Sequence, residues 1–187
     1  MSGKLTWRYR RAVSIAQRVR SSIALRGWRS TLLRISQEFV RRPVIDVTLP
    51  LLPLDEPFAP FGLPVSDTPR VSVVIPIHGK LAYTLTCLRS MASSPPTVPF
   101  EVIVVDDASP DESASILTQV QGVRLIRHAE NVGFVGSCNA GATSARGEFI
   151  VFLNNDTQVT PGWIESLLQC FESRPLCGIA GSQLVYP

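Results

Sequence analysis

Two stretches decide how this chain folds: Val-Val-Asp-Asp-Ala-Ser at 104–109 and Phe-Leu-Asn-Asn-Asp-Thr at 152–157. In each, polar and acidic residues directly follow a run of apolar and β-branched residues, as at the end of a buried strand. Because ligands bind at the carboxyl ends of the strands in an open parallel sheet, both turns are expected to face one cleft. Asp, Asn and Ser are also ordinary turn formers, so either turn alone leaves a purely structural role open.

The chain around these turns alternates between strand and helix patterns. Strands separated by helices of about 10 to 15 residues predict βαβ units. The expected fold class is therefore α/β: a Rossmann-like, mostly parallel sheet with helices on both faces, incomplete at the C-terminus. The predicted strands cover residues 71–76, 100–105, 123–126, 148–153 and 178–185, and the predicted helices cover 80–91, 111–120, 131–145 and a segment capped by Thr160 with Pro161 at its first position.

Residues 1–42 are predicted to form a basic amphipathic helical arm. Eleven Lys and Arg residues against one Glu give this segment a charge of +10, which leaves −7 for the rest of a chain whose net charge is +3. Apolar residues recur every three to five positions from Val13 to Phe39, as on one face of a helix. Through residues 4–42 the arm could contact an anionic membrane surface or an acidic protein partner, pack on its own body, or simply stay solvated, whereas no specific nucleic-acid contact is expected.

Residues 43–70 are predicted to be a linker. Seven prolines between Pro43 and Pro69 exclude a long helix and favour an extended segment strapped along the surface, which leaves 71–187 as the domain. The chain contains neither an apolar run of about 18 residues nor a secretory signal pattern. Its four cysteines have neither zinc-site nor disulfide-framework spacing. The expected location is therefore cytoplasmic, with possible peripheral contact at the inner membrane face.

Two strand ends carry candidate nucleoside-binding residues. Asp106 and Asp107 end one predicted strand, and Pro76 ends its neighbour. A carboxylate in this place can accept hydrogen bonds from a ribose hydroxyl or a pyrimidine N–H. The stretch 131–136 fits neither the Walker nor the dinucleotide glycine spacing, but Gly133 would let the backbone approach a ligand. The same glycines would also serve close packing of a helix on a strand.

The turn at 154–156 predicts a metal site. Mg²⁺ and Mn²⁺ take oxygen ligands and are commonly held by one or two carboxylates together with substrate phosphates. Asp156 and Asn154 could supply the protein's share of such a shell, and the ion would offset the charge that develops on a departing diphosphate. His78 and His128 are interpreted as strand-end hydrogen-bonding residues rather than catalysts.

An ordered set of motifs closely resembles the nucleotide-binding half of family 2 glycosyltransferases. The resemblance covers residues 71–187 and implies a GT-A fold. It also implies that a sugar moves from a nucleotide-diphosphate sugar to an acceptor with inversion, aided by Mg²⁺ or Mn²⁺. Assembly of cell-surface polysaccharide is the family-level expectation. The motifs that carry the resemblance are Val71–Pro76, Glu101–Ser109, Asn131–Phe134 and Phe152–Thr157.

The resemblance implies roles for individual residues. Pro76 would line the base pocket, Asp106 and Asp107 would contact the nucleoside, and residues 131–134, with Asn131 first, would open the helix beside the donor. The family's D-x-D element falls on residues 154–156.

Within that element Asn154 replaces the first acid, as in rhamnosyl- and O-antigen-type members, so Asp156 becomes the expected metal ligand and Asn155 part of the donor site. The resemblance further implies an acceptor site and a catalytic base beyond residue 187. Glu165 and Glu172 precede that half and are not nominated. The chain is therefore interpreted as a truncated donor-binding half.

Two functions other than a transferase are compatible with parts of the sequence pattern. A phosphoacceptor receiver domain would place its acidic pair on the first strand and needs a lysine downstream, but Lys80 is the last lysine of the chain. A non-catalytic nucleotide-sugar-binding or membrane-docked scaffold stays open. A scaffold binds the donor and releases no nucleotide, whereas an enzyme does both.

Overall fold

The computed structural model describes residues 51–54, 56–182 and 184–185. All of them belong to one compact unit, Leu49–Pro187. The predicted arm over 1–42 lies outside the described residues. Within the described part of the chain, no helix is both long and apolar enough to cross a membrane.

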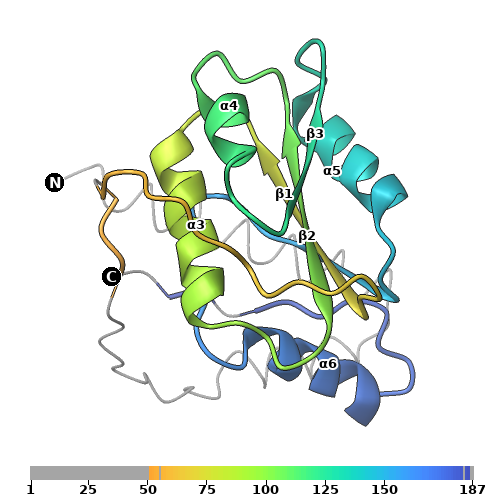
Figure 1. Ribbon diagram of the computed structural model, residues 1–187. Coiled ribbons are helices and arrows are strands. Elements are labelled where there is room, and N and C mark those ends of the chain that lie inside the picture. Colours follow the sequence, from red (N-terminus) through yellow and green to blue (C-terminus); the bar gives the residue numbers. More distant parts are fainter. Residues whose placement is uncertain (1–50, 55, 183, 186–187) are drawn as a thin grey trace, which may run out of the picture. The chain divides into compact units, whose positions relative to one another are not determined.

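Four parallel strands form the sheet, in the order β3-β2-β1-β4 (Figure 1). The two central strands are buried along their whole length, as expected for apolar runs inside a parallel sheet. The parallel α/β fold predicted from the sequence is confirmed. In chain order the elements are β1 (Val71–Ile77), α3 (Leu81–Ser93), β2 (Phe100–Asp106), α4 (Ser113–Leu117), β3 (Val123–Arg127), α5 (Gly133–Ser144), β4 (Phe149–Phe152) and α6 (Trp163–Ser173).

Helices cover both faces of the sheet. On one face, alternate side chains of β1 and β2 pack with Leu88 of α3, Leu117 of α4 and Ile164 of α6 in the larger core. On the other face, α5 is the one helix in the described part of the chain, opposite the layer that holds α3 and α4 (Figure 1). A Cβ at Gly141 would collide with the side chain of Val74, so glycine is what lets α5 lie this close to β1.

Three predicted elements differ from the structure. The strand predicted over 178–185 is wrong, because the described residues of that segment form no strand and Ile179 is 91% exposed. An apolar composition cannot make a strand without a neighbour to pair with. The helix predicted over 111–120 is only the five residues of α4.

The third difference concerns the start of α6. Thr160 does not cap this helix, and Pro161 is not its first residue. The helix begins at Trp163 after Gly162, whose φ of 77° is left-handed backbone that favours glycine. The Thr-Pro pair matches a common pattern for the start of a helix, but the helix itself begins two residues later.

The described part of the predicted linker lies along α3. Arg89 of α3 donates to the carbonyl of Pro57 at 3.0 Å and pairs with Glu56 at 3.2 Å. Further on, Gly62 forms a parallel bridge with Gln121. These contacts fix residues 56–62 against the sheet domain.

Candidate functional site

A cavity of about 390 Å³ opens at the carboxyl ends of β1, β2 and β4. Its volume lies within the range of small-molecule sites, and its place is where open parallel sheets bind ligands. The first turns of α5 and the residue before α3 complete its wall. The lining residues are Pro76, Ile77, His78, Lys80, Asp107, Asn131, Gly133, Phe134, Ser137, Asn154, Asn155 and Asp156.

The structure brings all but one of the residues proposed from the sequence to this cavity. The exception is Asp106, which is fully buried at the end of β2. Its Oδ1 accepts a hydrogen bond from the backbone N–H of Ser109 at 2.9 Å, and its Oδ2 lies 3.3 Å from Nε of Arg127. Consecutive strand residues point to opposite faces, so Asp106 and Asp107 separate. Asp106 shapes the turn instead of lining the cavity.

Asp107 ties the end of β2 to the start of α5. Its two carboxylate oxygens accept hydrogen bonds from the backbone N–H groups of Val132 and Gly133, both at 2.8 Å. A carboxylate at a helix N-terminus is favoured because it meets unpaired N–H groups and the positive end of the helix dipole. Each oxygen keeps a second lone pair for a ligand. Asp107 thereby places residues 131–134 beside the cavity.

His78 reaches the cavity from the end of β1. Its Nδ1 lies 2.8 Å from the backbone carbonyl oxygen of Asp107. A carbonyl can only accept, so Nδ1 is the donor in this contact. The interpretation of His78 as a strand-end hydrogen-bonding residue agrees with this contact. Its place in the cavity could not be read from a lone histidine in the sequence.

Lys80 is the one Lys or Arg among the described residues that line the cavity. Its backbone is left-handed, with φ 57° and ψ 47°, which costs free energy for a residue with a Cβ. Neighbouring contacts hold this conformation: the N–H of Gly79 donates to Oγ of Ser109 at 2.6 Å, and the N–H of Leu81 lies 3.4 Å from Asp111. These contacts fix the backbone of Lys80 in the cavity wall, and its exposed ammonium group lies 5.9 Å from the ring centroid of Tyr83.

The turn after β4 supplies exposed side-chain oxygens that could bind a metal ion. Asn154 and Asp156 are both exposed and line the cavity, whereas Asn155 is half-buried and donates from Nδ2 to Oγ1 of Thr84 at 3.0 Å. No three His, Cys, Asp or Glu side chains gather as a metal cluster in the part of the chain that the structure describes. A carboxylate and an amide oxygen fit Mg²⁺ or Mn²⁺ only where a ligand's phosphates complete the shell.

A family model and several known proteins match the chain. The model for "Glycosyl transferase family 2" matches residues 72–186. The O-antigen biosynthesis protein RfbC of Myxococcus xanthus is 32% identical over 130 residues, which are 66% of this chain and 10% of RfbC. The chain spans between 14% and 35% of the length of the first three curated relatives that it matches.

Two solved structures share the fold. Residues 1–349 of S. aureus TarS in complex with UDP-GlcNAc superpose with a TM-score of 0.51 at 22% identity, over 61% of this chain and 37% of TarS 1–349. The mannosyltransferase PcManGT of Pyrobaculum calidifontis, in complex with GDP-Man and Mn²⁺, gives 0.50 at 21% identity, over 63% of this chain and 36% of that one. At this identity the likeness shows the fold.

Proposed function

The chain belongs to glycosyltransferase family 2, and from that premise we propose that its cavity binds the nucleotide-diphosphate sugar from which the sugar is transferred. One observation carries the proposal. Three groups meet in one cavity at the ends of parallel strands. They are the carboxylate of Asp107, which can accept hydrogen bonds from a nucleoside, the ammonium group of Lys80, and the acidic turn that contains Asp156. A diphosphate with a nucleoside on one side needs these groups.

For each part of the nucleotide-sugar donor, the cavity has residues suited to bind it. Pro76, His78, Asp107 and Asn131 would hold the nucleoside, because they supply apolar surface and both donors and acceptors. Lys80 would meet the diphosphate charge. Asp156 and the amide oxygen of Asn154, with Asn155 behind them, would hold Mg²⁺ or Mn²⁺. The complexes of TarS with UDP-GlcNAc and of PcManGT with GDP-Man and Mn²⁺ support this assignment by analogy of fold.

The reaction we propose is an inverting transfer. An acceptor oxygen bonds to the anomeric carbon while the bond from that carbon to the diphosphate breaks, and the acceptor proton passes to a general base. The divalent ion, when bound, would act as a Lewis acid on the diphosphate. Lys80 would offset part of the same developing charge. The general base is not assigned to either carboxylate of this cavity, because Asp107 would contact the nucleoside and Asp156 the metal ion.

Neither glutamate of α6 is suited to be that base. Glu165 accepts hydrogen bonds from the N–H and hydroxyl of Thr97, at 2.5 and 2.8 Å. Burial would raise the pKa of Glu165, but these hydrogen bonds outweigh it and hold the pKa below the usual 4.5. Glu172 lies 3.6 Å from a guanidinium nitrogen of Arg70. Neither residue lines the cavity.

We further propose that the donor site serves cell-surface polysaccharide assembly. In this proposal residues 71–187 are the donor-binding half, 43–70 the linker, and 1–42 a basic arm that brings the chain to the inner membrane face from the cytoplasm. The similarity to RfbC, an O-antigen biosynthesis protein, supports the pathway class. The charge of +10 on the arm supports attraction to an anionic surface.

Release of nucleotide separates the transferase from a scaffold. The purified chain is incubated with UDP-, dTDP- and GDP-sugars, with Mn²⁺ and with membrane extract as the acceptor source, and free nucleoside diphosphate is measured. A transferase releases nucleotide in step with sugar transfer, and inversion appears in the anomeric proton coupling of the product. Donor binding without any release would favour the scaffold.

Lys80→Met is expected to weaken binding of nucleoside diphosphate by about 5- to 10-fold, since one charge-assisted contact at an exposed rim is lost. Lys80→Arg should keep most of the affinity because it keeps the charge. The matched control is Arg174→Met, which removes one positive charge from an exposed residue outside the cavity lining. Calorimetric titration checks all three variants, and equal losses in Lys80→Met and Arg174→Met would refute a specific phosphate contact.

A further inference from the structure

Helix α3 buries three small polar side chains on one face. Thr84, Cys87 and Ser90 follow each other at intervals of three residues, and each is no more than 4% exposed. A polar group inside a core costs free energy unless it has a hydrogen-bond partner. An apolar residue at any of these positions would pack a helix onto the sheet at lower cost. We call these three residues the polar stripe. Each of them needs a hydrogen-bond partner to offset the cost of its burial.

All three side chains of the polar stripe contact the segment 154–159. Thr84 accepts the hydrogen bond from Nδ2 of Asn155, and Sγ of Cys87 lies 3.8 Å from the carbonyl oxygen of Asn154. The backbone N–H of Val159 donates to Oγ of Ser90 at 3.0 Å. One helix face thus contacts the segment 154–159 at its first, second and last residues.

Besides the polar stripe, two contacts hold the segment 154–159: Val159 packs against the larger core, and Gln158 contacts Leu52. The last backbone bond to the sheet is from the N–H of Leu153 to the carbonyl of Val74 at 2.9 Å, and α6 begins only at Trp163. Inside the turn, Thr157 bonds back to the carbonyl of Asn154 at 2.6 Å. That bond closes the turn but does not place it relative to the cavity. The polar stripe supplies this placement.

Two hydrogen bonds from outside α3 also hold the segment. Gln158 accepts from the backbone N–H of Leu52 at 2.8 Å and donates to the carbonyl of the same residue at 3.1 Å. The segment is therefore held by residue 52 as well as by α3. Asn154 and Asp156 are exposed, while the residues around them are held by hydrogen bonds. The turn therefore presents two side-chain oxygens, as possible metal ligands, from a fixed backbone.

We propose that Thr84, Cys87 and Ser90 are positioning residues, which hold the segment 154–159 so that Asn154 and Asp156 face the bound diphosphate and its metal ion. The inference rests on the proposed function of the cavity. A misplacement of a metal ligand by a fraction of an ångström is enough to lower affinity, and residues behind metal ligands commonly matter for this reason.

Two substitutions on the polar stripe test the proposal against a matched control on the same helix. Thr84→Val and Ser90→Ala remove one hydroxyl each. The control is Thr86→Val, since Thr86 is equally buried, but its hydroxyl donates to the carbonyl of Ala82 in its own helix at 2.9 Å and lies 3.4 Å from the carbonyl of Pro53, and neither partner belongs to the segment 154–159. Thr84→Ser keeps the hydroxyl and serves as the rescue.

Affinity for whichever of UDP, dTDP and GDP the wild type binds is measured with Mn²⁺ and with EDTA, and hydrogen exchange of the segment 154–159 is followed by mass spectrometry. We expect Thr84→Val and Ser90→Ala to lose about 3- to 10-fold in the Mn²⁺-dependent affinity, with faster exchange confined to this segment. Affinity in EDTA should not change. Thr86→Val and Thr84→Ser should resemble the wild type.

The outcomes separate this inference from the proposed function. If the wild type binds nucleotide with Mn²⁺ and the stripe variants bind equally well, the positioning role is refuted while the donor site stands. If Thr86→Val loses as much as Thr84→Val, the effect is general loss of helix packing, which also refutes it. If the folded wild type binds none of the three nucleotides, the donor site fails and the inference fails with it.

Discussion

Asp156→Asn is expected to lower the Mn²⁺-dependent affinity for nucleoside diphosphate by roughly 30-fold or more. The substitution keeps the shape of the side chain but removes the carboxylate charge nearest the proposed ion. Loss of one charge beside a divalent cation costs about 2 kcal/mol or more even at an exposed site, where water screens the interaction. In EDTA the wild type and the variant should bind with equal, weak affinity, because the charge then has no ion to contact.

The matched control for this prediction is Asp67→Asn. Asp67 is exposed and does not line the cavity, so the same chemical change there should leave the affinity unaltered. Titration calorimetry of the three proteins, each with Mn²⁺ and with EDTA, provides the comparison. An Asp156→Asn variant that keeps wild-type affinity in Mn²⁺ would remove Asp156 from the metal site.

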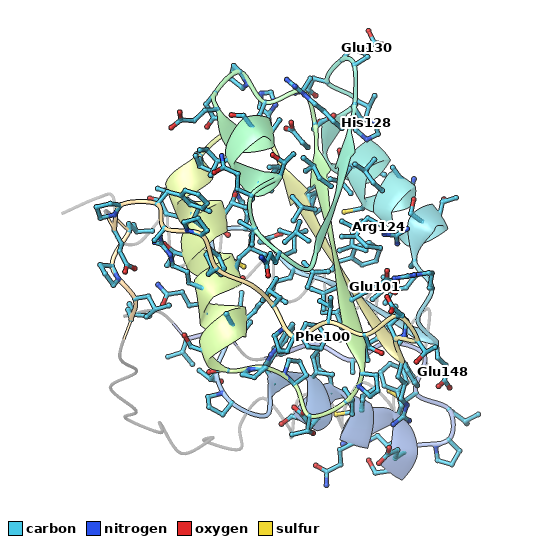
Figure 2. All side chains as sticks on the ribbon, in the orientation of Figure 1. Phe100, Glu101, Arg124, His128, Glu130 and Glu148 are labelled. Carbon is cyan, nitrogen blue, oxygen red and sulfur yellow. The ribbon has the colours of Figure 1, made fainter. Side chains whose placement is uncertain are left out.

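Glu101→Gln is expected to destabilise the domain by about 3 kcal/mol, the lower end of the cost of breaking a buried ion pair, because its two arginine partners are half-exposed. Glu101 is buried at the start of β2, with Arg124 of β3 beside it (Figure 2). One carboxylate oxygen accepts from the hydroxyl of Ser72 at 2.6 Å, and the other lies 3.0 and 3.1 Å from Arg124 and Arg146. These contacts join three strands at the end of the sheet opposite the cavity.

Thermal and urea unfolding measure this effect. For a domain of this size the loss corresponds to a fall in melting temperature of roughly 6 to 12 °C. Glu148→Gln is the control, since Glu148 is an exposed glutamate whose ion pair with Arg70 spans 3.7 Å and should contribute little. Equal melting temperatures for Glu101→Gln and the wild type would show that the network adds no stability.

The same carboxylate makes stability depend on pH. Burial would raise the pKa of Glu101, but hydrogen bonds from Ser72 and Arg146 and the charge of Arg124 outweigh it and hold the pKa below 4.5. A lowered pKa means that the contribution is fully present above pH 4.5 and is lost as the pH falls through the folded-state value. The difference in unfolding free energy between the wild type and Glu101→Gln should therefore be constant near neutral pH and shrink in acid. A constant difference down to pH about 3 would contradict the shift.

Much of the sheet could be predicted because its signals are local. Runs of β-branched residues in the two central strands can be buried on both faces only in a covered parallel sheet. The acidic turns at 106–107 and 154–156 follow such runs directly, so their place at one end of the sheet follows from strand direction alone. This is why the sequence pattern predicted most of the cavity lining.

The rest depends on contacts that local patterns do not encode. Asp106 and Asp107 look equivalent in the sequence, and only the strand's alternation turns one toward Arg127 and the other toward α5. Lys80 reaches the rim through left-handed backbone held by residues thirty positions away. Thr84 in a helix pattern gives no sign that its partner is Asn155. The roles of such side chains depend on contacts that exist only in the folded chain.

The central claim is that the cavity at the ends of β1, β2 and β4 binds a nucleoside diphosphate together with a divalent ion. Titration calorimetry of the full chain with UDP, dTDP and GDP, in Mn²⁺ and in EDTA, tests it most directly. The account predicts that at least one of the three nucleotides binds in Mn²⁺ and binds more weakly in EDTA. A chain shown to be folded by circular dichroism that binds none of the three in Mn²⁺ would contradict it.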